Sequence, residues 1–191
     1  MKINSYPVCT NKEMTMPEWI FPFLEQKIQN NTHEQKMDFL ARIAEQNIKE
    51  GTGGPFSAAV FEIQSGDLIS VGLNQVVSVK TSLAHAEIMA ILFAQKKVNH
   101  FRLDNGSYEL VSLAQPCAMC YGALFWSGIS RLVYGARKED VEELAGFDEG
   151  PLPDNWSARL ENRGIEVISD IGRDTACRVL KQYRQTGGLL Y

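Results

Sequence analysis

The chain has 191 residues, of which 45% are hydrophobic and 22% charged, a composition typical of packed globular proteins and not of disordered ones. The formal net charge of -4 argues against a broad basic surface for nucleic acids or acidic membranes. No stretch approaches the ~18 apolar residues of a membrane span, and residues 1–11 lack the apolar segment of a signal peptide. We therefore expect a cytoplasmic protein with neither membrane nor nucleic acid as partner.

The first half of the chain predicts two helices followed by a hairpin. A loose polar arm over residues 1–16 leads into a short helix over 17–28 that Pro22 interrupts. Apolar residues recur at helical spacing over residues 33–51 and predict a longer helix. After a Gly-Gly-Pro turn, two apolar runs separated by Ser-Gly-Asp predict paired strands over 56–63 and 68–77.

The second half alternates between helices and strands. The helices expected there cover residues 82–97, 117–128, 138–144, 156–164 and a last segment capped by Asp174, and the strands cover 108–114, 131–136 and 165–171. A hairpin followed by such alternation predicts an α/β fold with a mixed sheet of about five strands, antiparallel at one edge and covered by helices on both faces. No linker or repeat interrupts the chain, so we expect a single domain over residues 1–191.

Two short motifs carry the strongest chemical signal: His85-x-Glu87 and Pro116-Cys117-x-x-Cys120. Each motif alone is weak, because a single His often caps a helix and a Cys-x-x-Cys pair is also typical of redox proteins. Together they offer one imidazole and two thiolates, which suit zinc, and three protein ligands leave the open position of a catalytic site. A closed structural site would need one more protein ligand. The remaining candidates are Cys9 in the arm, Cys177 on an apolar helix face, His33 and His100. We expect the two histidines to be solvated, because their surroundings are polar.

The spacing within the first motif restricts where its site can lie. Residues i and i+2 project to different sides of a helix, so His85 and Glu87 can serve one site only at the helix N-terminus. The same holds for the two cysteines in the first turn of the helix that Pro116 opens. Two helix N-termini would then point at one metal ion and favour thiolates. Glu87 would stand beside the zinc without binding it, placed to transfer protons.

This combination resembles the cytidine deaminase-like zinc deaminases, whose H-x-E…P-C-x-x-C signature is a general one for the family. The resemblance implies that His85, Cys117 and Cys120 bind one Zn2+ ion with a catalytic water, and that Glu87 is the general acid/base. It also implies a three-layer α/β/α sandwich. In such enzymes zinc lowers the pKa of its water to about 7, and the activated water attacks an amino-bearing ring carbon.

Other stretches resemble the guanine deaminases, some of which also act on aminotriazines such as ammeline. The stretches are residues 53–62, 72–77, 84–91, 145–151 and the C-terminal 187–191. This resemblance implies conversion of guanine to xanthine and ammonia, as in purine metabolism, by a homodimer. In many relatives a Glu precedes the Pro-Cys pair, whereas this chain has Gln115, which keeps hydrogen-bonding capacity but lacks the charge.

The same resemblance implies roles for residues around the zinc motif. Phe56 would border the ring, Asn74 would hydrogen-bond the purine edge, and the backbone N–H of Ala86 would hold a substrate carbonyl. Trp126 would close the pocket, and Tyr191 would reach its own or a neighbour's pocket. Glu149 would be a second proton carrier. Each residue also has a plainer interpretation. The two aromatic residues would be core, Asn74 a strand bulge, Glu149 a solvated loop acid and Tyr191 a frayed end.

Several other functions fit the motifs. The substrate could be another free base, a nucleoside or a triazine, such as cytosine, cytidine or ammeline. A tRNA adenosine deaminase is a further alternative, although the acidic net charge and the lack of a Lys/Arg-rich terminal helix count against it. A non-enzymatic zinc-stabilised interaction module would need a fourth protein ligand and leaves Glu87 unexplained. A thiol redox protein leaves both His85 and Glu87 unexplained.

Overall fold

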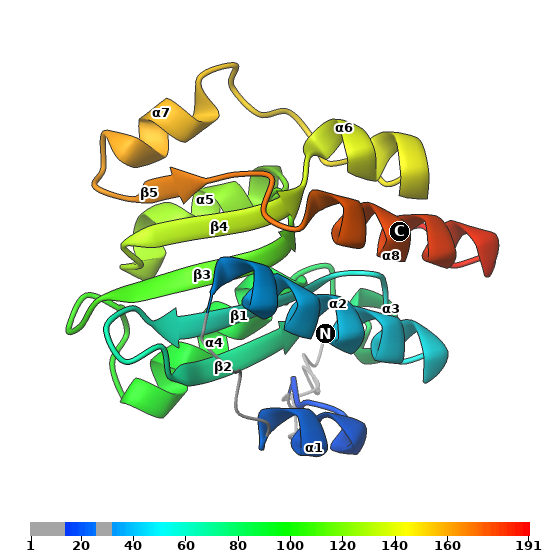
Figure 1. The fold of residues 1–191 in the computed structure, drawn as a ribbon, viewed down its shortest axis with the longest axis horizontal. Coiled ribbons are helices and arrows are strands. Elements are labelled where there is room, and N and C mark those ends of the chain that lie inside the picture. Colours follow the sequence, from blue (N-terminus) through cyan, green and yellow to red (C-terminus); the bar gives the residue numbers. More distant parts are fainter. Residues whose placement is uncertain (1–13, 26–31) are drawn as a thin grey trace, which may run out of the picture.

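The computed structural model describes residues 14–25 and 32–191. Most of the predicted arm over 1–16, together with Cys9, lies outside these residues, and residues 15–17 form neither helix nor strand. Figure 1 shows a single twisted sheet with helices in front of it and behind it. This arrangement confirms the predicted α/β/α sandwich.

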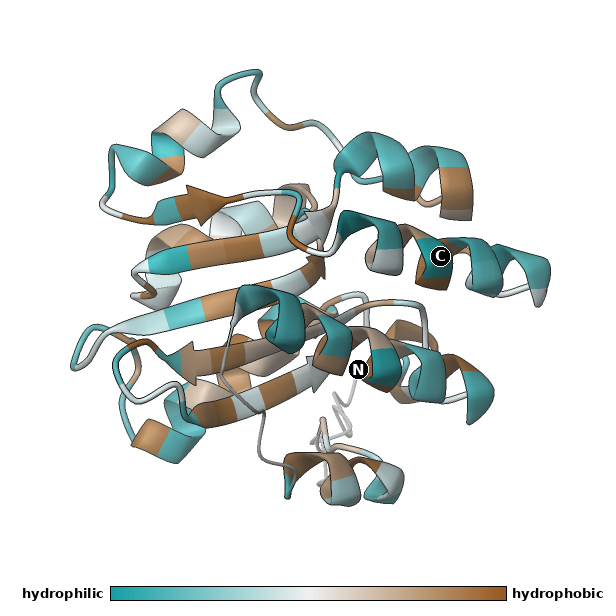
Figure 2. Ribbon diagram, in the orientation of Figure 1, coloured by the Kyte–Doolittle hydropathy of each residue, from teal (hydrophilic) through white to brown (hydrophobic). Residues whose placement is uncertain are grey.

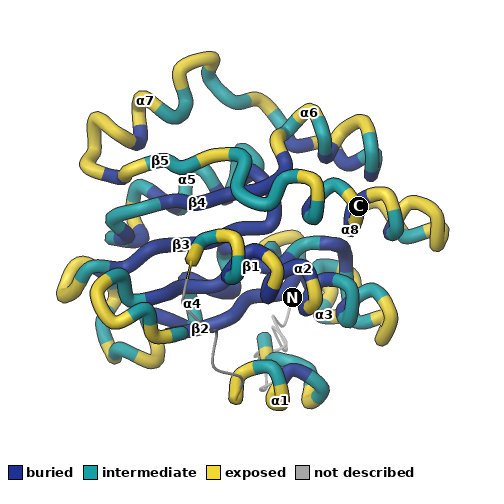
Figure 3. The backbone as a smooth tube through the Cα atoms, viewed as in Figure 1, coloured by how far each residue is buried: buried dark blue, intermediate teal, exposed yellow. Residues whose placement is uncertain are grey.

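The sheet has five strands in the order β2-β1-β3-β4-β5. Their bounds are Ser57–Glu62 for β1, Leu68–Leu73 for β2, Tyr108–Ala114 for β3, Arg131–Ala136 for β4 and Glu166–Ile168 for β5. β1 pairs antiparallel with both β2 and β3, whereas the β3–β4 and β4–β5 pairs are parallel. The mixed sheet with one antiparallel edge is therefore as the sequence predicts. All residues of the central strand β3 are buried, because helices cover both of its faces (Figure 3).

Two hydrophobic clusters fill the spaces on the two faces of the sheet. Helices α2 (His33–Lys49) and α8 (Arg173–Gln185) cover one face, while α4 (Ala86–Val98), α5 (Ala118–Ser127) and α7 (Trp156–Glu161) cover the other. α2 and α8 show an apolar stripe toward the sheet and polar residues outward (Figure 2). Within the described part of the chain, no helix is long and apolar enough to cross a membrane.

Short helices complete the chain. They are a 3-10 helix over Glu18–Ile20, α1 (Phe21–Leu24), α3 (Val76–Val79), α6 (Lys138–Asp140) and a π-helix over Val141–Ala145. The π-helix follows α6 directly and replaces the single acidic helix predicted over 138–144. π-helical turns are rare and often lie at functional sites, and this one leads into the loop that carries Glu149.

Three local predictions are wrong for identifiable reasons. Pro22 does not interrupt a helix but lies in the first turn of α1, where a missing N–H costs nothing. The predicted strand over 68–77 ends at Leu73, and Val76 begins α3, so the polar Asn-Gln pair is a strand end. Asp174 lies inside the first turn of α8, whose N-cap is Gly172.

Candidate zinc centre and active site

The site lies where α4 and α5 begin. His85 is the N-cap of α4 and Cys117 the N-cap of α5, and both have extended backbone before the helical turn. α4 packs so closely on β2 that a Cβ at Gly72 would lie only 2.0 Å from the Ala86 carbonyl oxygen. Glycine at this position is therefore what permits the close contact. α5 follows the C-terminal end of β3 through Gln115 and Pro116. The two N-termini therefore meet, as the spacing of the motifs predicts.

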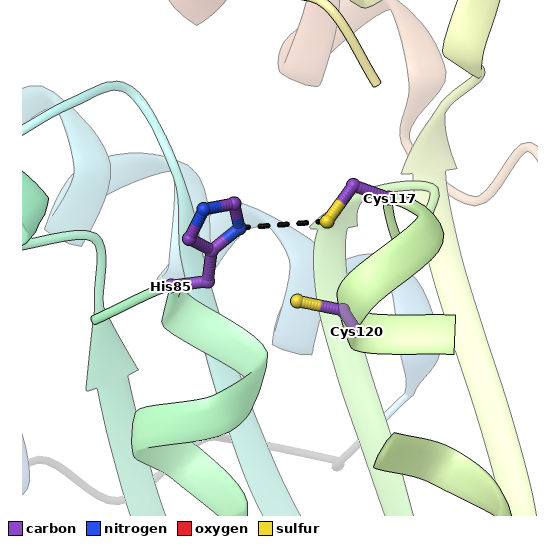
Figure 4. Close-up of side chains that lie close together, drawn as sticks. All are labelled: His85, Cys117 and Cys120. Atoms are coloured by element: carbon purple, nitrogen blue, oxygen red, sulfur yellow. Dashed lines mark hydrogen bonds between the residues drawn. The ribbon is translucent and has the colours of Figure 1, made fainter. Parts of the chain in front are cut away.

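The ligand atoms of His85, Cys117 and Cys120 all lie within 4.8 Å of one another. The Nδ1 atom of His85 faces the Cys117 sulfur at 3.5 Å, as Figure 4 shows. Tetrahedral zinc, with Zn–S of about 2.3 Å and Zn–N of about 2.0 Å, separates a sulfur and a nitrogen ligand by about 3.5 Å. Among the described residues no other His, Cys, Asp or Glu joins this cluster. The donor set fits zinc with one coordination position left open, as a catalytic site requires.

The two thiols are not equivalent. The pKa of Cys117 lies well below its usual value, because Cys120 donates a hydrogen bond to it and His85 lies beside it. The pKa of Cys120 is raised by that same hydrogen bond and by burial. For His85, burial lowers the pKa, but the hydrogen bond with Cys117 and the nearby Glu87 outweigh burial, so its pKa is raised overall. Zinc binding requires both sulfurs as thiolates, so at neutral pH it would displace the proton of Cys120, whereas Cys117 is already deprotonated.

Glu87 lies in the first turn of α4 and is 7% exposed. Its Oε2 lies 3.4 Å from the Cys120 sulfur and is a second acceptor for the single Cys120 S–H, which also faces Cys117. Burial, followed by the negative charge of Cys117, raises the pKa of Glu87 to about 7. A carboxyl group with a pKa near neutrality is suited to take up and release a proton.

Glu149 is the second buried acid of this region, and the structure brings it to the cluster. It is 8% exposed, and its carbonyl oxygen accepts a hydrogen bond of 3.0 Å from the N–H of Ala118 at the start of α5. Burial, together with the charges of Cys117 and Glu87, raises the pKa of Glu149 to about 8. This environment contradicts the plainer interpretation of a solvated loop acid.

Tyr191 interacts electrostatically with both acids and connects them to an amide and to further aromatic rings. Asn74 directly follows β2 and is 1% exposed, and its Oδ1 accepts a hydrogen bond from the Tyr191 hydroxyl of the same chain. The ring centroid of Phe147 lies 5.1 Å from those of both Phe56 and Tyr191. Tyr191 is therefore not a frayed end, and in this structure it reaches its own chain's site.

Two further predicted substrate contacts have different outcomes. Ala86 is the first residue of α4, so its backbone N–H has no acceptor within the helix and is available at the site. Trp126 lies on the last turn of α5, ~13 Å along the helix from Cys117 at 1.5 Å per residue. It is 76% exposed, so it is not core. The structure of this chain does not bring it to the zinc cluster.

Several residues around Asn74 have no motif in the sequence that marks them. Asn47 in α2 is fully buried, and its Nδ2 donates to the carbonyl oxygens of Gly54 at 2.9 Å and Asn74 at 3.0 Å. A Cβ at Gly53 would lie 1.8 Å from the backbone carbonyl oxygen of Asn74. The Gly53-Gly54 pair is therefore the sequence feature that could have indicated this close contact. No sequence pattern predicted that Phe147, which lies in a loop, would pack against Phe56 and Tyr191.

Gln115 is 7% exposed, and its Oε1 accepts a hydrogen bond of 3.3 Å from the backbone N–H of Lys138. The amide thus joins the end of β3 to the first residue of α6.

The comparison of the sequence with protein families gives a match. A family model for the cytidine and deoxycytidylate deaminase zinc-binding region matches residues 30–136. The chain is 34% identical to the guanine deaminase of Bacillus subtilis over 133 residues, which are 70% of this chain and 82% of that protein. It is 33% identical over 116 residues to a tRNA-specific adenosine deaminase of Buchnera aphidicola, which cover 61% of this chain and 72% of that one.

The comparison of folds gives a longer match. A solved structure of the guanine deaminase from Nitrosomonas europaea superposes with a TM-score of 0.84 and 42% identity, covering 90% of this chain and 94% of that one. Together with the zinc-fitting cluster at the meeting helix N-termini, these matches show that the chain belongs to the cytidine and deoxycytidylate deaminase zinc-binding family and is a zinc-dependent hydrolytic deaminase.

Proposed function

We propose that this chain hydrolyses guanine to xanthine and ammonia. The observation that carries the proposal is the group of rings of Phe56, Phe147 and Tyr191, which pack on one another and of which Tyr191 interacts electrostatically with both Glu149 and Glu87. Flat aromatic rings pack well against a planar base. The likeness to the Nitrosomonas europaea guanine deaminase covers 90% of the chain and so is not confined to the zinc motif.

The proposed mechanism assigns a task to each residue. His85, Cys117 and Cys120 hold the zinc ion, which when bound acts as a Lewis acid that activates water. Glu87 accepts one proton from the attacking water and delivers it to a ring nitrogen. It then takes the remaining proton of the added hydroxyl group and transfers it to the amino group, so that the carbonyl forms as the C–N bond breaks and ammonia leaves. One water molecule is consumed, and the ring carbon gains an oxygen in place of the amine.

The remaining residues bind the base and supply a second proton carrier. The Asn74 amide and the Ala86 N–H hold the purine edge, and Phe56 borders the ring. Glu149 carries protons between the site and solvent, a role supported by its burial and by its electrostatic coupling to Glu87. Tyr191 covers the bound base. We place Trp126 at the contact between subunits of a dimer, because it is exposed on a helix without charged residues.

A tRNA adenosine deaminase is the second candidate, because one such protein is 33% identical. Tyr191 disfavours it, because the C-terminal residue packs on Phe147 and donates to Asn74, which would cover a site that a polynucleotide needs to be open. The net charge of -4 also disfavours RNA. Free cytosine, cytidine and ammeline remain as alternative small substrates.

Four further properties belong to the same proposal. We infer a single deaminase domain, because α2 and α8, from opposite ends of the described chain, pack on one sheet and on each other. We also infer a homodimer that works in the cytoplasm as part of purine metabolism. Light scattering of the purified protein would test the dimer, and a monomeric mass would contradict it.

The direct test is ammonia release from a panel of substrates by purified protein of known zinc content. We expect about one zinc ion per chain and the highest kcat/KM for guanine. If kcat/KM were higher for ammeline, cytosine or cytidine, that compound and not guanine would be the preferred substrate. Release from a tRNA anticodon stem but from no free base would support the second candidate.

A further inference from the structure

The last five residues, 187–191, form what we call the C-terminal strap, and Tyr183 in α8 fastens it. The strap leaves α8 at Gly187, whose φ of 72° turns the chain back. The Gly188 N–H donates to the Tyr183 carbonyl oxygen at 3.1 Å, and the Tyr183 hydroxyl donates to the Leu189 carbonyl oxygen at 2.7 Å. A Cβ at Gly188 would lie 2.2 Å from the Tyr183 ring, so the strap runs directly across that ring.

The same tyrosine also supports the wall against which the strap ends. Its ring is 6% exposed and stacks on Phe147, with centroids 5.8 Å apart and an interplanar angle of 22°. Phe147 in turn contacts the Tyr191 ring, with centroids 5.1 Å apart. One side chain therefore holds both the strap and the surface that receives Tyr191.

At its end the strap determines how the Asn74 amide is turned. The Asn74 Oδ1 accepts from the Tyr191 hydroxyl at 2.5 Å and from the Val76 N–H at 3.4 Å. Among the residues that the structure describes, Asn74 Nδ2 has no hydrogen-bond acceptor. Gly54 makes room for this arrangement, because a Cβ there would lie 2.3 Å from the Tyr191 hydroxyl.

An amide can present either its oxygen or its nitrogen to a ligand, and turning it exchanges an acceptor for two donors. With Oδ1 engaged by the strap, Asn74 presents its NH₂ group, which selects a substrate edge that carries an acceptor. Without the strap, only the longer contact with Val76 holds the amide in this orientation. Burial raises the pKa of Tyr191, which keeps its hydroxyl protonated and able to donate.

We propose that Tyr183 is a positioning residue for substrate recognition: its hydroxyl holds the C-terminal strap, so that Tyr191 orients the Asn74 amide with its NH₂ group toward an acceptor on the purine. This proposal rests on the proposed function for the identity of the substrate. The hold of Tyr183 on the strap does not depend on that identity.

The variant that tests the proposal is Tyr183→Phe, which removes the hydroxyl and keeps the ring stacked on Phe147. We expect faster hydrogen–deuterium exchange in the peptide covering residues 186–191. We also expect the KM for guanine to rise about threefold to tenfold, the range for one lost hydrogen bond, with kcat changed less than about twofold. Tyr108→Phe is the matched control, because Tyr108 is another buried tyrosine but begins β3 at the other end of the sheet.

A second background separates positioning from a general loss of stability. In Tyr191→Phe the hydroxyl that holds Asn74 is already missing, so adding Tyr183→Phe should raise the KM by less than about twofold further, as expected for coupled residues. Full additivity of the two changes, or unchanged exchange of residues 186–191 in Tyr183→Phe, would overturn the proposal. Wild-type protein without guanine turnover would contradict the proposed function, while the exchange measurement would still decide whether Tyr183 holds the strap.

Discussion

The two ends of strand β3 lie beside buried carboxylates in opposite electrostatic settings. Near its first residue, Glu109 is 1% exposed and is bonded to Lys36 Nζ at 2.7 Å, His33 Nε2 at 3.0 Å and Arg131 Nη1 at 3.1 Å. Burial raises the pKa of Glu109, but the hydrogen bonds and charges of Lys36 and His33 outweigh it, so the pKa is lowered overall. His33 is thus a hydrogen-bond partner of a buried carboxylate, where a solvated side chain was predicted.

Beyond the last residue of β3, Glu87 and Glu149 are nearly as buried but have no such partners. Among the described residues neither forms an ion pair, and their pKa values rise to about 7 and about 8. Burial alone therefore does not decide the state of a carboxyl group, and its partners do. Glu109 joins structural elements as a permanent anion, whereas Glu87 and Glu149 can exchange protons near neutral pH.

The largest effect expected from this difference is on turnover. Glu87→Gln should lower kcat by about 100- to 10,000-fold, because the amide cannot transfer the proton. Zinc content should stay at about one per chain, since Glu87 lies outside the ligand cluster. Metal analysis beside ammonia release measures both quantities. Loss of zinc in this variant would make Glu87 a ligand, contrary to the proposal.

At the other end of β3 the expected effect is on stability. Glu109→Gln should lower the free energy of unfolding by about 3–5 kcal/mol, because it leaves the buried Lys36 ammonium without its partner. Urea unfolding of the zinc-loaded protein measures this loss. Glu166→Gln is the matched control, since it removes an exposed partner of Arg131 and should cost less than about 1 kcal/mol. Equal losses in the two variants would remove the distinction between the two acids.

The pH dependence of stability should have opposite signs at the two ends. Glu109 has a lowered pKa, so its stabilisation is present above pH ~4.5 and is lost as the pH falls through its folded pKa. Glu87 has a raised pKa, so the folded state binds its proton more tightly and stability declines as the pH rises from ~4.5 through about 7.

Metal-free protein is the sample in which to measure this difference. Relative to Glu87→Gln, the wild type should lose about 2 kcal/mol of unfolding free energy between pH 5 and pH 7. Relative to Glu109→Gln, it should lose stability only at acidic pH. Parallel curves for wild type and Glu87→Gln would show that burial does not raise the pKa of Glu87.

The smallest expected effect concerns the second acid of the site. Glu149→Gln should lower kcat about tenfold, because proton transfer to solvent slows while Glu87 still acts. Asp148→Asn is the control, since Asp148 is exposed beside it and its carboxylate only accepts the Gly150 N–H in the loop. Unchanged turnover in Glu149→Gln would leave Glu149 as a structural acid of the loop.

Much of the fold could be predicted because its signals are local. The alternation of apolar runs and helical spacing gave five strands and the main helices, since both periodicities act over a few residues. The predicted end of β2 was four residues too late, because Val76 and Val77 continue the apolar run of the strand beyond the polar Asn74 and Gln75. The N-cap of α8 is Gly172 and not Asp174, because the backbone at this position has a φ of 57°, which glycine adopts more easily than aspartate.

The metal chemistry of this protein follows from its local sequence motifs. One imidazole and two thiols at the starts of two helices specify zinc, and the His-x-Glu spacing requires a site at a helix tip. Three other features depend on tertiary packing. The Tyr191 hydroxyl meets Asn74, 117 positions earlier in the chain, the Glu109 carboxylate pairs with the cations of Lys36 and Arg131, and Trp126 stays exposed on the last turn of α5. A motif encodes contacts within one helical turn, whereas contacts between distant segments depend on how the whole core packs.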